Sequence, residues 1–282
     1  MATGREKPFI SVVIPNYDGA GIIGACLESL KRQTHTSFEV LVVDNGSRDD
    51  SIDIVRRLAP EAIIVPQTRN LGFAGGVNAG VRAARGSWIA VLNNDTEAAE
   101  DWLEEVAAAI ERHADAAFLA CRILDFNNRH RLYSAGDCFL RAGFGYRRGQ
   151  ELSDCPRYHQ EGEVFSACGC AAIFRKSVFE EARGYDENLF AYLEDIDLGL
   201  RLQASGHRGY FVPKAEVFHR GGARSAPPDE TALARIPRPV MGGHSTLRDD
   251  GAARLYYGYR RDQFGFPQMV LPSFLTADRA RK

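Results

Sequence analysis

Three groups of acidic residues are spaced so that a folded chain could gather them at one edge of a sheet. Asp44 ends the segment VLVVD, Asp95 ends LNND, and Glu194 and Asp195 lie together in AYLEDID. Asp44 and Asp95 directly follow short apolar runs, so each is expected at the carboxyl end of a buried strand, where open α/β sheets bind ligands. Carboxylates there suit Mg²⁺ or Mn²⁺, which prefer oxygen donors and leave positions open for phosphate oxygens.

A glycine-rich segment, NLGFAGGVNAG at residues 70–80, lies between Asp44 and Asp95 in the sequence. Gly72, Gly75 and Gly76 precede a predicted helix, but the pattern is not GxGxxG and follows the third predicted strand rather than the first. A nicotinamide-type dinucleotide site is therefore disfavoured. Glycines at this place would still let backbone N–H groups approach a ligand.

Each candidate residue also has a purely structural interpretation. Asp44 in DNGS is either a turn residue or an acceptor for the imide N–H of a pyrimidine base. Asp95 is either a turn cap or a metal ligand. Glu194 and Asp195 either complement the dipole of a helix start or supply a general base, which that dipole would keep ionised. His219 ends an apolar strand and is either structural or a metal ligand.

The predicted elements come from the periodicity of apolar residues. Over the first ~110 residues, short apolar runs alternate with helical patterns, which predicts a mainly parallel sheet covered on both faces. Residues from about 124 to 163 show little periodicity and are expected to form an irregular substrate loop. The predicted strands are 9–15, 38–44, 62–66, 88–95 and two short ones ending at residue 219; the predicted helices are about 23–30, 50–58, 78–85, 177–182, 194–204 and 253–266. Residues 221–251 are expected to be a mobile lid.

Composition excludes several classes of protein. A net charge of −2 gives no electrostatic footprint for nucleic acid. The start of the chain lacks an apolar signal core, and no apolar run approaches the ~18 residues of a membrane span. A cytoplasmic protein is expected, with peripheral association at the inner face of a membrane left open. The six cysteines are expected to be reduced, and Cys168-Gly169-Cys170 favours close backbone packing over a metal or redox site.

Taken together, the motifs resemble a family-2 glycosyltransferase of the GT-A fold. Five blocks occur in the order of that family: VVIPNYDG, VLVVDNGSRDDS, NLGFAGGVNAG, LNNDT, and GYDENLFAYLEDIDLGLRLQASG with VFHRGG after it. The resemblance covers about residues 9–219, and several blocks are most similar to the rhamnosyltransferase-like branch. It implies an α/β domain with a Rossmann-like sheet. The expected divisions are a donor-binding half (1–115), an acceptor-side and catalytic half (116–220), and a lid with a C-terminal helix (221–282).

The resemblance also implies a role for individual residues. LNNDT stands at the DxD position, so Asp95 would be the main metal ligand, with Asn93 replacing the first acidic residue. His219 matches the downstream metal-binding histidine, and Asp195, beside Glu194, matches the catalytic base of inverting members. The expected donor-binding residues are Pro15, Asn16, Tyr17, Asp44, Asn70, Gly72, Phe73, Asn78 and Asn94. Tyr256, Tyr257 and Arg260 resemble an aromatic–arginine helix.

The implied reaction is an inverting, metal-dependent transfer of a sugar from a nucleoside diphosphate to an acceptor hydroxyl in a glycan, a lipid-linked or another acceptor. The donor would be linked to dTDP or UDP, with dTDP-rhamnose suggested by the branch. Two alternatives belong to other classes. A nucleotidyltransferase would need a basic loop after the first strand, and PNYDGAGIIGA has no Lys or Arg. An inactive nucleotide-sugar-binding module would not need Asp95, Asp195 and His219.

Overall fold

A computed structural model describes residues 10–140, 144–221, 258–261 and 267–270 of the 282-residue chain. Its helices are α1 (Ile23–Lys31), α2 (Ser51–Leu58), α3 (Gly72–Ala83), α4 (Trp102–Arg112), α5 (Lys176–Glu181) and α6 (Glu194–Ala204), with 3₁₀ turns η1 (Pro156–Tyr158) and η2 (Glu187–Leu189). Its strands are β1 (Ile10–Asn16), β2 (Phe38–Asp44), β3 (Ile63–Pro66), β4 (Trp88–Leu92), β5 (Thr96–Ala98), β6 (Ala116–Asp125), β7 (Leu132–Ser134), β8 (Asp137–Leu140), β9 (Phe144–Arg147), β10 (Gly162–Glu163), β11 (Ala171–Arg175), β12 (Arg208–His219), β13 (Gly258–Arg261) and β14 (Pro267–Val270).

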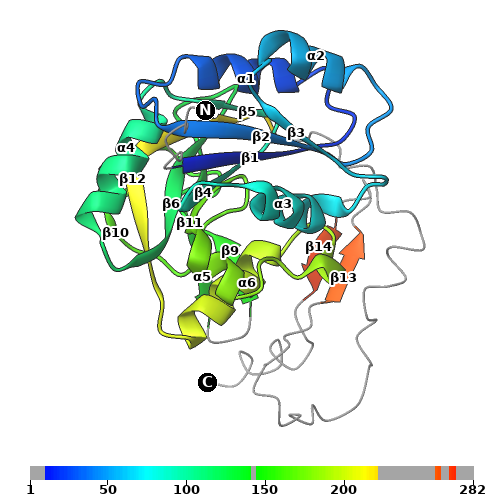
Figure 1. Cartoon of the computed structure of the whole chain (residues 1–282). Coiled ribbons are helices and arrows are strands. Elements are labelled where there is room, and N and C mark those ends of the chain that lie inside the picture. Colours follow the sequence, from blue (N-terminus) through cyan, green and yellow to red (C-terminus); the bar gives the residue numbers. More distant parts are fainter. Residues whose placement is uncertain (1–9, 141–143, 222–257, 262–266, 271–282) are drawn as a thin grey trace, which may run out of the picture.

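One twisted sheet runs through the molecule in the order β10-β12-β6-β11-β4-β1-β2-β3, and short strands β5 and β7 pair beside this path (Figure 1). Strands β4, β1, β2 and β3 are parallel, as the alternating pattern predicted. β11 is antiparallel to both of its neighbours and joins this parallel block to the parallel pair β6 and β12. The sheet is therefore mainly parallel, with one reversed strand near its centre.

Two apolar cores lie on opposite faces of the sheet, because successive strand residues point to opposite sides. On one face, Val12 and Val42 pack with the apolar stripes of α1, α2 and α4. On the other face, Val13 and Val43 pack with α3, α5 and α6. Figure 1 shows α1 and α2 above the sheet and α3 below it. Both faces are covered, and functional side chains are left for the sheet's edges.

The glycine-rich segment differs from its prediction, since α3 begins at Gly72 rather than near Asn78. Helix α3 lies so close to the sheet that a Cβ on Gly80 would stand 2.3 Å from Cγ1 of Val13. The low helix propensity of glycine is outweighed here by close helix–sheet packing. The glycines that were expected to form a loop are therefore mostly packing residues within a helix.

Residues 116–220, the expected acceptor-side half, are more regular than predicted. The expected irregular loop at 124–163 contains the end of β6 and the short strands β7, β8, β9 and β10, and the two strands expected before His219 are one strand, β12, with a register shift between Val212 and Glu216. Strands of two to four residues carry too few side chains to show a period. The predicted C-terminal helix is also wrong at residues 258–261, where β13 pairs antiparallel with β14. Aromatic residues such as Tyr259 favour strands.

Other expectations fall outside the described residues, namely most of the predicted lid at 221–251, together with Tyr256 and Tyr257. In the part of the chain that the structure describes, no helix has the length and apolar character needed to cross a bilayer.

Candidate active site

The expected metal ligands, Asp95 and His219, lie side by side. Asp95 follows β4 in the turn before β5, and the antiparallel pairing of β5 with β12 places Thr96 opposite His219. Nε2 of His219 is 3.1 Å from Oδ1 of Asp95, and both side chains are buried. The N–H of Arg220 donates to the carbonyl of Asp95 at 3.0 Å, which fixes the backbone around the pair. Strand pairing thus joins two residues that are far apart in the sequence.

This pair fits a divalent cation. Ligands at adjacent corners of an octahedron with metal–ligand distances of ~2.1 Å are ~3.0 Å apart, close to the 3.1 Å between these two atoms. One carboxylate oxygen and one imidazole nitrogen suit Mn²⁺ or Mg²⁺. The buried Oδ1 of Asn93, two residues before Asp95 in the sequence, has no hydrogen-bond partner among the described residues. No cluster of three or more His, Cys, Asp or Glu side chains suited to a metal occurs within those residues. Any cation here would keep positions open for ligand oxygens.

Asn16 and Asn94 join the ends of β1 and β4. Nδ2 of Asn94 donates to Oδ1 of Asn16 at 2.8 Å, and Nδ2 of Asn16 donates to Oγ of Ser51 at 2.9 Å. Asn16 is 1% exposed, so its amide acts inside the protein as a brace between strand ends. Pro15 is buried beside it, and Tyr17 is partly exposed at the edge. Of the expected donor-binding residues of this group, Tyr17 and Asn94 retain exposed surface.

Asp44, at the end of β2, forms the turn that its structural interpretation predicted. Its Oδ1 accepts the backbone N–H of Ser47 at 2.9 Å. The side chain is partly exposed, and this bond uses one of its two carboxylate oxygens. The turn therefore orients Asp44 at the carboxyl edge of the sheet without excluding contact with a base.

Backbone N–H groups at the start of α3 were expected to be available for a ligand, but two of them donate hydrogen bonds within the protein. The N–H of Gly72 donates to Oδ1 of Asn70 at 2.8 Å, and the N–H of Ala74 donates to the carbonyl of Phe190 at 3.1 Å. The amide of Asn78 bonds the backbone of Tyr185 at both of its ends, at 2.8 and 3.0 Å. Asn70 therefore caps the start of α3, while Ala74 and Asn78 hold the helix against the segment that precedes α6.

Asp195 is oriented by backbone donors at the start of α6. Its Oδ2 accepts the N–H of Gly169 at 3.1 Å, and its Oδ1 accepts its neighbour Ile196's N–H at 2.9 Å. Burial raises the pKa of Asp195, and these two N–H groups oppose the rise. The helix dipole alone predicted the opposite direction, so desolvation outweighs it here. A carboxylate with a raised pKa accepts a proton more readily than an exposed aspartate does.

Glu194 is 5% exposed, and its Oε2 has no hydrogen-bond partner in the described part of the chain. Burial, with the charge of Asp195, raises the pKa of Glu194 well above its usual value. The approach to α6 is strained, since Phe190, Tyr192 and Leu193 all have positive φ angles, of 60°, 75° and 68°. Left-handed backbone at non-glycine residues commonly marks functional sites.

The turn Cys168-Gly169-Cys170 connects the two halves of the site. The carbonyl of Cys170 accepts the N–H of Asn93, next to the Asp95 turn, at 2.9 Å, while the N–H of Gly169 holds Asp195. A Cβ on Gly169 would stand 3.1 Å from Cε1 of Phe73 and 3.3 Å from Oε1 of Glu194. All six cysteines are free. These distances support the packing interpretation of this turn and show that Phe73 lies against it.

Sequence reasoning missed three residues beside this site. Asp137 and Arg147 are opposite each other in the β8–β9 hairpin, and Tyr133 on β7 meets His219 edge-on, with ring centroids 4.3 Å apart. All three lie in the segment that was expected to be irregular. Gly143, just before FGYR, is the turn signal that could have indicated a hairpin.

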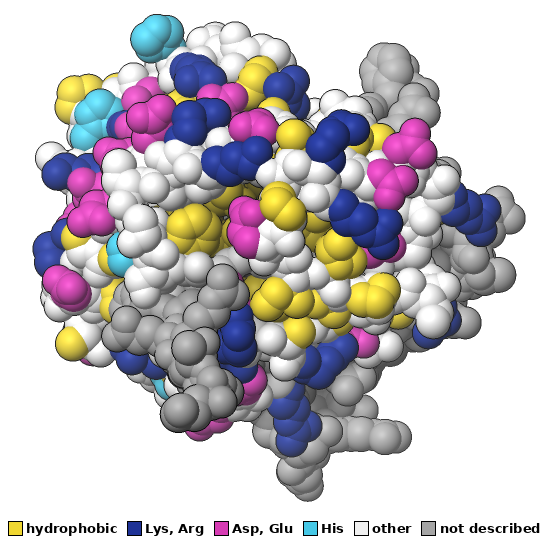
Figure 2. Space-filling view, turned by 45° about the horizontal axis from the view of Figure 1, so that its top comes forward, with side chains coloured by type: hydrophobic (Ala, Val, Ile, Leu, Met, Phe, Trp, Pro, Cys, Tyr) yellow, Lys and Arg dark blue, Asp and Glu magenta, His cyan; other side chains and the backbone are white. Residues whose placement is uncertain are grey.

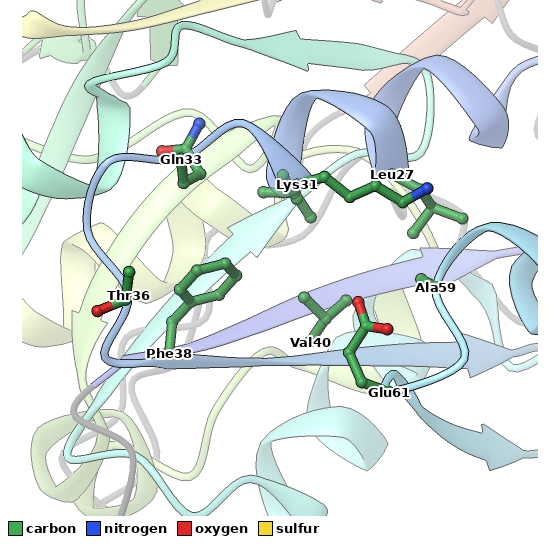
Figure 3. A pocket seen from close by; sticks show the side chains of 9 residues that line it. Leu27, Lys31, Gln33, Thr36, Phe38, Val40, Ala59 and Glu61 are labelled. Carbon is green, nitrogen blue, oxygen red and sulfur yellow. The ribbon is translucent and has the colours of Figure 1, made fainter.

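Two further surface features contain none of the candidate metal-binding or catalytic residues. A hollow of about 300 Å³ between α1 and the beginning of β2 is lined by Leu27, Phe38 and Val40, with Lys31 and Glu61 at its rim (Figure 3). It lies near the start of β2, whereas Asp44 ends that strand. On the face shown in Figure 2, basic and acidic side chains are interspersed rather than separated into fields of one sign.

Solved structures share the fold at low sequence identity. GalNAc-T7 with UDP, GalNAc and Mn²⁺ matches with a TM-score of 0.63 at 16% identity, covering 76% of this chain and 44% of that one. A mannosyltransferase from Pyrobaculum calidifontis in complex with GDP-Man and Mn²⁺ matches with a TM-score of 0.57 at 21% identity, covering 78% and 59%. The fold is therefore the GT-A type of glycosyltransferases.

Sequence comparison is more specific. The family model described as Glycosyl transferase family 2 matches residues 11–183. The PGL/p-HBAD biosynthesis glycosyltransferase of Mycobacterium bovis is 38% identical over 237 residues, covering 82% of this chain and 84% of that protein. The N-acetylglucosaminyl-diphospho-decaprenol L-rhamnosyltransferase of Mycobacterium tuberculosis is 28% identical, covering 74% and 75%. This chain belongs to glycosyl transferase family 2 and is a glycosyltransferase.

Proposed function

We propose that this enzyme transfers a sugar from a nucleoside-diphosphate donor to an acceptor hydroxyl with inversion at the anomeric carbon. The observation that carries the proposal is the 168–170 turn, which holds Asp195 by one bond and the turn before Asp95 by another. A base and a diphosphate-binding edge are then fixed relative to each other by a short stretch of backbone. Family membership favours this reaction over nucleotidyl transfer and over an inactive binding module.

In this proposal Asp195 removes the proton from the acceptor hydroxyl as the oxygen attacks the anomeric carbon. The bond from that carbon to the donor's diphosphate breaks in the same step, so the sugar's configuration inverts. Both oxygens of Asp195 accept backbone N–H groups, which fix the orientation of the proposed base. Glu194 is buried behind it and is assigned to shaping the base's environment rather than to proton transfer.

Asp95 and His219 are the proposed ligands of Mn²⁺ or Mg²⁺. Such an ion would neutralise charge on the leaving diphosphate. The neighbouring Asn16–Asn94 brace would fix the strand ends around it. Solved structures of this fold that contain Mn²⁺ with UDP or with GDP-Man support the assignment.

The proposed donor carries a pyrimidine nucleotide, dTDP or UDP. The second carboxylate oxygen of Asp44, Oδ2, can accept the single imide N–H of uracil or thymine. Tyr17 is partly exposed and can line the same carboxyl edge of the sheet. A relative named as an L-rhamnosyltransferase favours dTDP-rhamnose as the sugar donor. Residues 1–115 are accordingly assigned to the donor and 116–220 to the acceptor and catalysis.

The names of the relatives favour an acceptor from glycoconjugate or polysaccharide synthesis, with a lipid-linked glycan as one possibility. Such an acceptor would bring a cytoplasmic enzyme to the inner face of a membrane without a spanning helix.

The decisive experiment screens nucleotide sugars for Mn²⁺-dependent release of nucleoside diphosphate and then compares donor and product by proton NMR. Inverted configuration with a dTDP- or UDP-sugar is the expected result. Asp195→Asn should reduce turnover by ~10²–10⁴ because asparagine cannot take the proton. Retained configuration, or a variant with more than half of wild-type turnover, contradicts the role of Asp195.

A further inference from the structure

The β8–β9 hairpin brings two charged residues of the acceptor-side half against the start of α6. Asp137 and Arg147 are paired across the hairpin, so both project from the same face. Gly145, also on this face, lies so close to α6 that a Cβ would stand 2.6 Å from Cδ1 of Ile196. The ring of Phe139 stacks on Phe165, with centroids 5.2 Å apart. The hairpin is therefore packed tightly beside Asp195.

Asp137 is a buried carboxyl group without hydrogen bonds. It is 1% exposed, and within the described residues neither of its oxygens has a partner. Its backbone N–H donates to the carbonyl of Ser166 at 2.9 Å, and Oγ of Ser166 donates to the carbonyl of Asp195 at 2.6 Å. One residue, Ser166, thus ties the hairpin to the catalytic helix. Asp137, Glu194 and Asp195 form a cluster of three carboxyl groups.

Arg147 projects from the same face of the hairpin as Asp137. Its guanidinium carbon lies 4.3 Å from the centre of the Tyr133 ring, a cation–π contact that holds the side chain in one direction. Its charge favours the ionised form of both Asp137 and Asp195. Arg147 is partly buried, so water screens its charge less than it would at the surface.

The three carboxyl groups do not ionise equally. Burial raises the pKa of Asp195, but its two backbone donors and then Arg147 oppose the rise. Burial and a neighbouring carboxyl group raise the pKa of Asp137 and of Glu194 well above their usual values. Like charges in one site cannot all ionise together. Cys168 and Tyr185 also face the cluster, and burial raises the pKa of both so far that they stay neutral. Arg147 therefore adds its charge to the two backbone donors that favour the ionised form of Asp195.

We propose that Arg147 is a positioning residue that holds Asp195 as the ionised member of this three-carboxyl cluster. The proposal rests on the proposed role of Asp195 as the base. Because a cation stabilises the carboxylate, removing it favours the protonated form, and Asp195 then becomes ionised only at higher pH. A base works when it is ionised, so the acid limb of the pH–rate profile should move to higher pH.

The experiment compares pH profiles of kcat/KM for the wild type, Arg147→Met, Arg147→Lys and Arg148→Met, all in the full chain with Mn²⁺ and the nucleotide sugar that the donor screen identifies. Arg148 is the matched control, since it lies next to Arg147 but packs over Tyr158 and Phe211 instead. Arg147→Met should move the acid limb upward and lower kcat/KM on that limb by about tenfold for each pH unit moved. Arg147→Lys should largely restore the wild-type limb, and Arg148→Met should leave it in place.

If Arg147 had a purely structural role, Arg147→Met would lower the plateau of the kcat/KM–pH profile without moving its acid limb. An acid limb that is unmoved in Arg147→Met, or moved equally in Arg148→Met, overturns the proposal. Carbon NMR of ¹³C-aspartate-labelled enzyme gives a second readout without substrate, with the Asp195 carboxyl signal assigned by its loss in Asp195→Asn. That titration should shift upward in Arg147→Met alone. If Asp195→Asn kept its turnover, the base assignment would fail, but the NMR titration would still decide whether Arg147 controls the ionisation of Asp195.

Discussion

Gly169→Ala should lower the catalytic rate while leaving the fold largely stable. The N–H of Gly169 orients Asp195, and its neighbour's carbonyl, that of Cys170, holds the turn before Asp95. Gly169 has no positive φ, so alanine can adopt its backbone conformation. What the substitution adds is one methyl group at the point where the two halves of the site meet.

The size of the effect follows from the space around that methyl group. It would lie 3.1 Å from Cε1 of Phe73 and 3.3 Å from Oε1 of Glu194. Carbon atoms pack best at ~3.5–4.0 Å, so the turn must shift by several tenths of an ångström. Overpacking of this kind typically costs ~1–3 kcal/mol of stability, and we expect the lower end because Phe73 is partly exposed and can yield. A misplacement of ~1 Å in a catalytic group can cost ~10²-fold in rate, so a smaller shift should lower kcat by ~10-fold or more.

The assay is kcat and KM for the donor, with stability measured by urea unfolding. Gly162→Ala is the control, since a Cβ at that position meets nothing within 4 Å. We expect Gly169→Ala to lose kcat with little change in donor KM, and the control to keep both. A Gly169→Ala enzyme with kcat within twofold of wild type would refute the view that this turn sets the position of Asp195.

Three other perturbations test separate parts of the molecule. Asp95→Ala should weaken the Mn²⁺ dependence of nucleoside-diphosphate binding in calorimetry, because it removes the proposed oxygen ligand; an unchanged dependence would place the ion elsewhere. Gly80→Ala should destabilise the fold by ~1–3 kcal/mol in urea unfolding, since its Cβ would meet Val13 at 2.3 Å and Val43 at 2.9 Å; an unaltered midpoint would contradict the tight packing of α3 on the sheet. Asp137→Asn should gain stability relative to wild type as pH rises. Because the pKa of Asp137 is raised, the native state holds this proton more tightly than the unfolded chain, so wild-type stability falls above the unfolded pKa. Equal slopes of stability against pH for the two proteins would contradict this prediction.

The strands of the first half could be predicted because each contains a short apolar run between segments of helical or turn character. Strand β2 was placed at Phe38–Asp44 and α6 at Glu194–Ala204, as observed. The start of α3 could not be predicted from propensity, because Gly72 to Gly80 read as a loop until the neighbouring strands are present. The tertiary contact, not the local sequence, makes this segment helical.

The site was harder to predict than the fold. Periodicity placed Asp95 near a strand end, but nothing local joins it to His219; the resemblance to a family did so, and the pairing of β5 with β12 is the physical cause. Asp137 and Arg147 escaped notice because β8 and β9 are four residues each, too short to show alternation. The direction of the pKa shift at Asp195 was also missed, because burial at a helix start cannot be read from spacing.

The position of β11 has a consequence for how the chain can be made. β11 is the seam of the sheet, hydrogen-bonded to β4 on one side and β6 on the other. A nascent chain that has not yet reached Ala171 therefore holds two open strand edges, and open edges invite pairing with other chains. Strands β1 to β4 precede β11 in the chain, yet the open edge of β4 has no partner until β11 has been synthesised. A fragment ending before β11 should then aggregate instead of folding as a nucleotide-binding unit, and exchanging donor halves between relatives should succeed only if β11 is carried across with β4.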